Sequence, residues 1–393
     1  MIELVVNAQT YTNFENIEIK SSLTTIARSF VFRAYSNAKQ AFPFAVNDPC
    51  QVKIDGMLVL TGFVEITEAS YSHKSHAILI SGRSKTSDVV DSSLGDNIEF
   101  KGSQSLKSLI EATLTQANIT GISVIDTVGD IPDFAETELE SPSTGMTVFA
   151  FIERFCRKRQ VLVTTNGAGD IVIARGETKQ ERFTLLNTFA TPDTNNILSG
   201  SVTFDASKRF RKYFVRSGGN PAAGGGGLIL GPEDDAGAVN KAVVNSEGEA
   251  EDRGDLSTPR GLVIVPVVRT SRQMYIVSET ASTNDICRLR AIWQANMNRV
   301  KSFKYKVTVQ GFTNELTGNV WEPNFLVKVN DVFANVKGQL LIESVTYKVS
   351  TTGGSTTELT LVIPDAYKVL AEEPLGVKKS TSLVLGPRRG PGT

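Results

Sequence analysis

Short runs in which apolar and polar residues alternate recur along the chain, and they constrain its fold more than any other feature. Examples are Ile17–Lys20, Phe30–Arg33, Val52–Asp55, Ala77–Ile80, Tyr305–Val309 and Leu359–Ile363. Alternation with a period of two places one set of side chains against a core and the other toward solvent or a neighbour. Turn-forming residues such as Asn47-Asp48-Pro49 and Asp55-Gly56 lie between such runs. The pattern predicts a mainly β fold.

The order of the runs near the N-terminus is repeated near the C-terminus. The first set is Val52–Asp55, Leu60–Val64, a polar hairpin and Ile78–Ile80, and the second is Val327–Asn330, Leu340–Val345, a polar hairpin and Leu359–Leu361. From Val64 to Ile78 is 14 residues, and from Val345 to Leu359 is the same. The shared order favours duplication and predicts two similar β-barrels in one chain. Three such chains would form a ring of six similar lobes, and closed cyclic symmetry is the usual way in which oligomers terminate.

Three segments carry apolar residues at helical spacing instead. They run from about Ser105 to Asn118, from about Met146 to Arg159 and from about Thr283 to Val300. Asp285 in the first turn of the third segment and Arg299 in its last turn suit the helix macrodipole. Core packing best explains all three apolar stripes. The fold class is therefore predicted to be mainly β with α+β parts.

The composition argues against several classes of protein. The net charge is −1 and neither half of the chain is strongly basic, which argues against tight binding to nucleic-acid phosphates. No run of about 18 apolar residues occurs, so no membrane span is expected. Met1–Val6 lacks the charged and apolar regions of a secretory signal. Cys50, Cys156 and Cys287 lie far apart and indicate isolated thiols in a reducing cytoplasm.

Motifs for catalysis or metal binding are not found in the sequence. The two histidines, His73 and His76, could supply two metal ligands, but no cysteine or carboxylate cluster lies nearby to complete a site. On a strand, their spacing would also place the rings on opposite faces. Gly224–Gly227 is not followed by Lys-Ser or Lys-Thr and is interpreted as a linker. We therefore expect no catalytic residue, no cofactor and no bound metal.

Charged clusters leave alternatives open. Glu136, Glu138 and Glu140 could include a glycosidase-like acid pair, although no aromatic sugar platform accompanies them. Two basic clusters could contact phosphates, namely Arg154, Arg157, Lys158 and Arg159, and Lys208, Arg209, Arg211 and Lys212. A solvated face or a set of interface salt bridges is the favoured interpretation of both basic clusters.

Several stretches resemble one known family. Pro43–Gly56 and Ile80–Asp91 are similar to the N-terminal barrel of the Mu-like phage tail protein family. Val309–Phe312, Trp321–Asn324 and Leu340–Ile342 are similar to the last barrel of that family. The resemblance spans most of the chain in order, except for a Gly-rich and acidic insertion at 218–261, longer than expected for the family, and the C-terminal tail.

The resemblance implies a structural protein and not an enzyme: the baseplate hub of a contractile phage tail. Such a hub is a homotrimer whose paired barrels imitate a sixfold ring. It joins the tail tube to the threefold spike and surrounds the channel through which DNA leaves without sequence-specific binding. The implied partners are the spike, tail tube or tail-terminal adaptor proteins and other baseplate proteins. The implied location is the virion, after assembly in the host cytoplasm, with no membrane contact.

The length of 393 residues and the resemblance together predict the domain organisation. The first β-barrel spans 1–100, with 198–217 as a segment that could complete it. A small peripheral α/β domain spans 101–197. The second β-barrel spans 198–370, with the insertion 218–261 and the helix 283–300, and a tail spans 371–393. The insertion has too few apolar residues to offset the entropy of ordering, so it is either flexible or ordered only by a partner.

Two other functions stay open at this point. A tail-associated cell-wall hydrolase should show a catalytic Glu or a Cys/His pair within a recognisable pattern, and none is found. A host-receptor or carbohydrate-binding module should expose aromatic residues in loops. Trp293 lies on a helical stripe and Trp321 in a Trp-Glu-Pro-Asn turn, so neither tryptophan favours that function.

Overall fold

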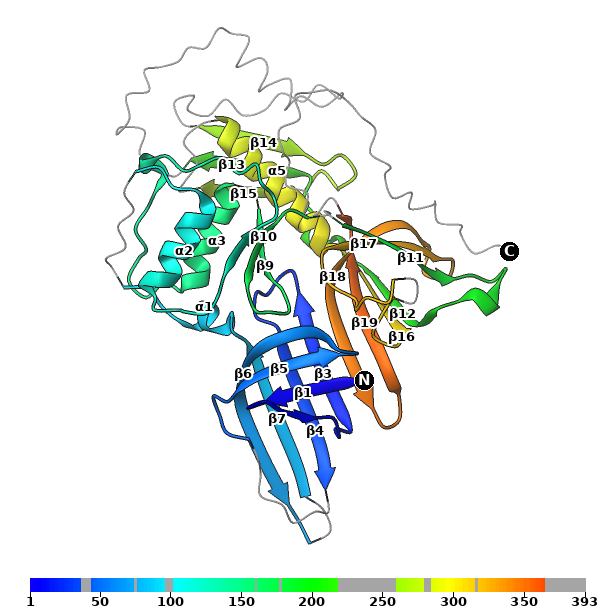
Figure 1. Cartoon of the computed structure of the whole chain (residues 1–393). Helices are drawn as coiled ribbons and strands as arrows, with labels where there is room; N and C mark the ends of the chain where they lie inside the picture. Colours follow the sequence, from blue (N-terminus) through cyan, green and yellow to red (C-terminus); the bar gives the residue numbers. More distant parts are fainter. Residues whose placement is uncertain are drawn as a thin grey trace. The chain divides into compact units, whose positions relative to one another are not determined.

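The structure is a computed structural model (Figure 1), and it describes most of the chain. The described residues are 1–36, 44–73, 76–95, 102–159, 161–176, 179–217, 259–278, 284–314 and 317–364. The chain divides into two compact units. Unit 1 comprises Met1–Val202 and Tyr305–Thr393, and unit 2 comprises Thr203–Lys304. The predicted insertion 218–261, except its last three residues, and the whole predicted tail 371–393 lie outside the described residues.

Seven strands form the first lobe of unit 1, which we call lobe 1. They are β1 (Ile2–Val6), β2 (Gln9–Tyr11), β3 (Asn16–Ser22), β4 (Ser29–Ser36), β5 (Pro49–Ile54), β6 (Met57–Tyr71) and β7 (His76–Ser84). Their order in the sheet is β3-β4-β7-β6-β5-β1-β2, with antiparallel neighbours. Alternate residues such as Leu4, Ile19 and Phe32 are fully buried, as the period of two predicts.

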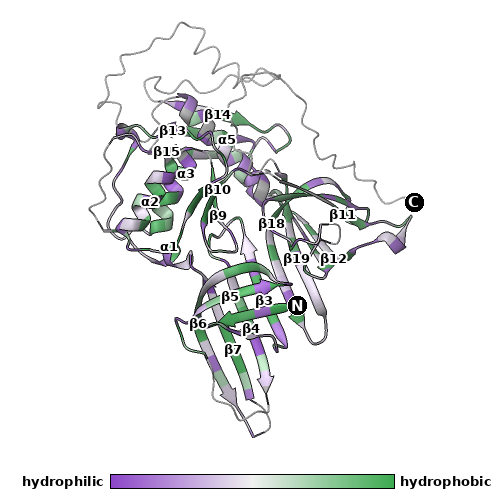
Figure 2. Cartoon of the chain, in the orientation of Figure 1, coloured by the Kyte–Doolittle hydropathy of each residue, from purple (hydrophilic) through white to green (hydrophobic). Residues whose placement is uncertain are grey.

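The sheet of lobe 1 curls, so that β1 and β5 cross over β3, β4 and β7 (Figure 1). A register shift in β6 between Val64 and Ile66 marks a β-bulge, which bends the strand. A Cβ on Gly62 would lie 1.9 Å from the Arg83 carbonyl oxygen, so only glycine allows β6 and β7 to approach at this point. Hydrophobic and hydrophilic residues alternate along several of these strands (Figure 2).

A small α/β module follows lobe 1 in the chain. It contains α1 (Ser87–Asp91), α2 (Leu106–Gln116), β8 (Val124–Asp126), a short 3-10 turn η1 (Glu136–Glu138), α3 (Val148–Lys158), β9 (Leu162–Thr165) and β10 (Ile171–Ala174). The two predicted helices are confirmed, and the hydroxyls of Ser105 and Thr147 cap them by accepting bonds from the backbone N–H three residues on. The apolar stripes of α2 and α3 pack into one core with the sheet β8-β10-β9.

The second lobe of unit 1, which we call lobe 2, comes from two separated parts of the chain. Its strands are β11 (Lys179–Asn187), β12 (Ile197–Phe204), β16 (Phe303–Gln310), β17 (Phe325–Asp331), β18 (Val336–Ser350) and β19 (Gly354–Val362), with a short turn η2 (Pro192–Thr194). The order in the sheet is β12-β16-β19-β18-β17-β11, and β11 runs parallel to β17. Strand β18 also pairs with β3, so the two lobes share one continuous sheet.

Unit 2 has its own small core. Strands β13 (Lys212–Ser217), β14 (Arg260–Ile264) and β15 (Gln273–Ser278) form a sheet in the order β14-β13-β15, preceded by the turn η3 (Ala206–Lys208). Helix α5 (Asn284–Lys301) confirms the predicted helix at 283–300. Cys287 and Ala291 of α5 pack on Tyr213 and Val215 of β13.

The fold class is confirmed as mainly β with a small helical content, but the structure divides the chain differently from the predicted domains. Strand β11 falls in the predicted α/β domain 101–197, yet it pairs with β17 of lobe 2. The predicted second barrel 198–370 contains unit 2 as a separate body. Residues 198–217 supply β12, which pairs with β16, and β13, which pairs with β14 and β15, so they do not complete lobe 1 of the same chain. Each pairing joins segments far apart in sequence, which local periodicity does not specify.

The structure also corrects the inference from the two equal 14-residue spacings. Val345 pairs with Leu359, but Val64 pairs with Gly82 and not with Ile78, because the first hairpin is longer. The equal spacing in the sequence therefore does not reflect an equal pairing of strands. The repeated order of strands is real in the sheet, and duplication of the lobes stays a prediction.

Candidate functional site

A buried ion pair lies where the parts of unit 1 meet. Arg28, in the turn between β3 and β4, is only 2% exposed. Its guanidinium donates to both carboxylate oxygens of Glu322, from Nη1 to Oε1 at 3.0 Å and from Nη2 to Oε2 at 2.8 Å. The same two nitrogens donate to the carbonyl oxygens of Val59 at 2.8 Å and Thr165 at 2.7 Å. This is the fork geometry in which arginine binds a carboxylate most strongly.

The four partners come from three parts of unit 1. Arg28 and Val59 belong to lobe 1, Thr165 ends β9 of the α/β module, and Glu322 lies in the loop between β16 and β17 of lobe 2. One guanidinium therefore holds the two lobes and the module together. A buried charge that loses its partner is costly, by about 3–5 kcal/mol, so the arrangement resists relative movement of these parts.

Aromatic packing surrounds this junction on the lobe 2 side. Trp321 is fully buried beside Glu322, and Phe183 meets it edge to face with ring centroids 5.4 Å apart. The Tyr347 hydroxyl of β18 donates to the Trp321 carbonyl oxygen. Burial raises the pKa of Tyr347 well above its ordinary value, and the nearby Glu322 carboxylate raises it further. Tyr347 therefore stays a neutral donor, and the loop carrying Glu322 is fixed to β18.

The β9–β10 turn of the module docks on β6. The Thr61 hydroxyl donates to the Gly167 carbonyl oxygen at 3.1 Å. A Cβ on Gly167 would lie 2.1 Å from the Leu58 carbonyl oxygen, so a side chain does not fit between the turn and the strand. Together with the Arg28–Thr165 bond, this contact places the module directly against lobe 1.

The histidines of the sequence analysis do not form a site. His76, in β7, stacks on Tyr71 of β6 with ring centroids 6.3 Å apart, while His73 is exposed in the turn. Among the described residues, no group of three or more His, Cys, Asp or Glu side chains is placed to hold a metal ion. The two stacked rings are part of the β6–β7 hairpin.

The acidic residues considered as a catalytic pair are bound to the basic residues considered as a phosphate patch. Glu138 accepts two bonds from Arg159, at 3.0 and 2.8 Å, and Glu140 pairs with Arg154 at 3.0 Å. Arg157 pairs with Glu153 at 2.7 Å within α3. Arg159 also lies over the Phe134 ring at 3.8 Å. The charges of the two clusters thus pair inside the module and not across an interface, while Glu136 is exposed and the Lys158 side chain is not described.

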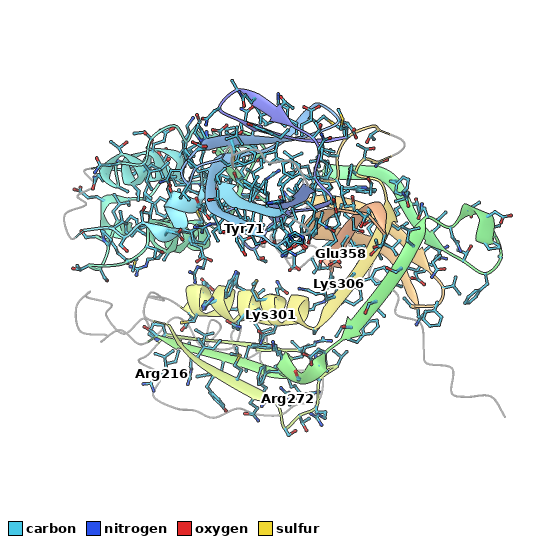
Figure 3. All side chains as sticks on the ribbon, turned by 90° about the horizontal axis from the view of Figure 1, so that it is seen from below. Tyr71, Arg216, Arg272, Lys301, Lys306 and Glu358 are labelled. Carbon is cyan, nitrogen blue, oxygen red and sulfur yellow. The ribbon has the colours of Figure 1, made fainter. Side chains whose placement is uncertain are left out.

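The second basic cluster, in unit 2, is largely structural. Arg211 is buried and donates to the Pro266 and Val268 carbonyl oxygens at 2.8 and 3.3 Å. Arg272, labelled in Figure 3, donates to the carbonyl oxygens of Arg209 and Ser207 and lies over the Phe210 ring. These guanidiniums tie the chain that leads into β13 to the turn before β15. The remaining members, Lys208, Arg209 and Lys212, lie on the same short stretch.

The cysteines are isolated, as the sequence predicts. Cys50, Cys156 and Cys287 are buried and free. Burial raises the pKa of the Cys50 thiol to about 12 and also raises those of Cys156 and Cys287. Buried thiols with raised pKa values are poor nucleophiles. No helix in the described part of the chain is long and apolar enough to cross a membrane.

The sequence analysis missed the Arg28–Glu322 pair. The two residues are 294 positions apart, and Arg28 stands alone between two strand patterns. The only available signal was Glu322, which lies within the Trp-Glu-Pro-Asn turn that resembles the family pattern.

Family models match two separate parts of the chain. The model described as "Mu phage baseplate assembly protein GpP-like, N-terminal" matches residues 1–84, the whole of lobe 1. The model described as "Mu phage baseplate assembly protein GpP, fourth domain" matches residues 283–370, which contain β16 to β19. A curated relative, baseplate hub protein gp44 of Escherichia phage Mu, is 23% identical over 373 residues, covering 94% of this chain and 90% of the relative.

Two solved structures share the fold over nearly the whole chain. The 43 kDa tail protein of prophage MuSo2 from Shewanella oneidensis is 22% identical, with a TM-score of 0.74 and coverage of 94% of this chain and 99% of that one. A tail protein from Neisseria meningitidis MC58 is 18% identical, with a TM-score of 0.74 and coverage of 93% and 97%. The curated relative is thus a baseplate hub protein, and both solved structures are of tail proteins. Both family models and the curated relative support a Mu-like baseplate hub family for this chain.

Proposed function

We propose that this chain is the non-enzymatic hub of a contractile phage baseplate, and that three copies form a closed ring. The observation that carries the proposal is the repeated order of strands. Lobe 1 has the order β3-β4-β7-β6-β5 and lobe 2 has the order β12-β16-β19-β18-β17. Three chains with two similar lobes each would present six similar lobes around one axis. Such a ring matches a sixfold partner on one side and a threefold partner on the other.

The proposed partners follow from this symmetry. The sixfold side meets the tail tube or its adaptor, the threefold side meets the spike, and other baseplate proteins bind the outside, where the α/β module lies. The rigid junction at Arg28 suits a part that transmits load between tube and spike, since it holds both lobes and the module in one arrangement. The hub acts in the virion after assembly in the host cytoplasm.

DNA passes through the ring without sequence-specific binding. A strongly basic wall would retain the phosphates, so the lining is expected not to be strongly positive. Where the lobes join, charges of both signs alternate: Glu18 and Lys20 of β3, Lys348 of β18 and Glu358 of β19. A gel-shift titration with duplex DNA at physiological salt should show no specific complex.

The test of the oligomer is the mass of the purified protein by light scattering after size exclusion. The expected value is three times the 42.6 kDa of one chain. A monomer or dimer at all concentrations would contradict the ring. Clearing of cell wall by the same preparation on a zymogram would instead support a hydrolase.

A further inference from the structure

The two lobes correspond strand by strand. The pairs are β3 and β12, β4 and β16, β5 and β17, β6 and β18, and β7 and β19, in the same order along the chain and with the same neighbours in the sheet. The long strands β6 and β18 each carry one bulge against the following strand, after Val64 and after Ile342. Aligning these bulges makes Ile66–Tyr71 of lobe 1 equivalent to Ser344–Val349 of lobe 2.

The lobes differ in what lies beside these equivalent segments. Ser344–Val349 of β18 has β19 on one side and β3 on the other. Ile66–Tyr71 of β6 has β7 on one side, while the β5 ladder on the other side stops at Phe63. Among the described residues, no strand occupies the place on β6 that β3 occupies on β18. Within the described part of the chain, lobe 1 therefore has an open edge on β6 where lobe 2 has a partner.

The strand equivalent to β3 is also open. Strand β12 stands at the end of the described sheet, paired with β16 only. Its sequence, Ile197–Phe204, has no charged residue and no proline, and Leu198 is 57% exposed. Soluble proteins normally protect such edges with charges, prolines or bulges, because an uncharged edge strand pairs readily with another chain.

We infer that β12 of one copy adds antiparallel to Ile66–Tyr71 of the next copy, as β3 adds to β18 within the chain. This inference rests on the proposed ring. The contact is head to tail, and such a contact closes into a ring when its rotation allows. Three copies would then contain six junctions of one kind, three within chains and three between them. The exposed side chains of Leu198, Ile66 (57%) and Tyr71 (84%; Figure 3) would become covered.

The register follows from the internal junction. The Asp205 N–H donates to the Ser302 carbonyl oxygen and the rings of Phe204 and Phe303 are in contact, so Val202 of β12 lies opposite Tyr305 of β16. Tyr305 is equivalent to Phe30, which pairs with Ile19 of β3. Val202 therefore corresponds to Ile19, and Ser201 to Glu18. Within the chain Glu18 lies opposite Lys348, whose equivalent in β6 is Ser70. Ser201 of one copy should face Ser70 of the next, and Thr203 should face Glu68.

Cysteine cross-linking of the full chain tests this geometry. Directly opposed residues of antiparallel strands are close enough for a disulfide. Under mild oxidation, Ser201→Cys/Ser70→Cys should form disulfides between copies, giving a ladder that ends at three chains on a non-reducing gel. Each single variant should stay at one chain, because a head-to-tail contact never places a residue against its own copy. The three native thiols are buried, so they should not interfere.

Three further variants complete the experiment. Thr203→Cys/Glu68→Cys tests the next pair on the same face. Glu18→Cys/Lys348→Cys is the equivalent pair within one chain and should cross-link without a change of mass. Ser201→Cys/Thr10→Cys places the second thiol on β2, at the far end of the sheet, and should not link copies.

The possible outcomes test the strand addition and the trimeric ring separately. Failure of both β12–β6 pairs in a protein that remains a trimer by light scattering would overturn the strand addition and leave the proposed function standing. Cross-links at these pairs that end at two, four or more chains would support the strand addition and contradict the trimer. Cross-linking of Ser201→Cys/Thr10→Cys as efficient as that of Ser201→Cys/Ser70→Cys would overturn the register.

Discussion

Arg28 and Glu322, 294 residues apart in sequence, meet in a two-pronged ion pair with nitrogen–oxygen distances of 3.0 and 2.8 Å. Because Arg28 also binds backbone carbonyl oxygens of lobe 1 and the α/β module, the pair connects three parts of unit 1. Such a connection keeps the three parts in one arrangement, because the ion pair can break only if the parts separate.

Removing one partner should destabilise unit 1 strongly. Glu322→Gln leaves a buried guanidinium without a compensating charge, so the free energy of unfolding should fall by about 3–5 kcal/mol. Glu153→Gln, which breaks the exposed pair with Arg157 in α3, is the matched control and should cost no more than about 0.5 kcal/mol. Urea denaturation of both variants measures the difference. The double variant Arg28→Met/Glu322→Leu should lose less than Glu322→Gln; an equal or larger loss would contradict the assignment of the cost to the unpaired charge.

Gly167→Ala should loosen the contact of the α/β module with β6. The added Cβ would meet the Leu58 carbonyl oxygen at 2.1 Å, which requires the β9–β10 turn to move away. The expected loss of stability is about 1–3 kcal/mol, typical of overpacking. Gly95→Ala is the control, since nothing lies within 4 Å of its Cβ position. Thermal unfolding that shifts equally for both variants would show that the close approach does not matter.

Acid should weaken lobe 2 through Glu358. The bond from Lys348 at 2.8 Å lowers the pKa of Glu358 from its ordinary 4.5, with smaller contributions from Lys306 and Lys20 (Figure 3 labels Glu358 and Lys306). A carboxyl with a lowered folded pKa contributes stability that is present above 4.5 and is lost as the pH falls through the folded value. Lys348→Met should therefore flatten the decline of the melting temperature below about pH 4.5. An unchanged slope would show that the pair does not contribute.

The three thiols should not react with a thiol reagent in the folded protein. Burial raises the pKa of Cys50 to about 12 and raises the others as well, so almost no thiolate is accessible at pH 8. A chromogenic disulfide reagent at that pH should report no reactive thiol in the native protein and three after unfolding in guanidinium. Rapid modification of any thiol in the native state would show that its surroundings open.

A charge on the edge of β12 should weaken the oligomer. Leu198→Lys would place an ammonium at the end of the proposed β12–β6 junction, and burial of an unpaired charge is unfavourable, so the dissociation constant should rise at least about tenfold. Val267→Lys is the control, because Val267 is also an exposed apolar residue but belongs to unit 2 and to neither strand. Sedimentation at several protein concentrations measures the change. An equal effect of the two variants would count against the junction.

The local elements of the fold could be read from the sequence because each depends on neighbours within a few residues. Alternation along β3 and β4 placed Ile19 and Phe32 in the core, and Ser105 and Thr147 marked where α2 and α3 begin. The family resemblance rested on similar local patterns. The functional junction at Arg28 could not be predicted in this way, because a single arginine between two strands carries no signal of a partner in another lobe.

By itself, the sequence determined the mainly β character, the position of the helices and the repeated order of strands. Only the tertiary structure decided that β18 pairs with β3, that β11 joins lobe 2, and that Arg28 meets Glu322. The physical reason is that backbone hydrogen bonds are the same for every residue. A strand's pattern specifies which face is buried, but its partner is set by the packing of the whole unit.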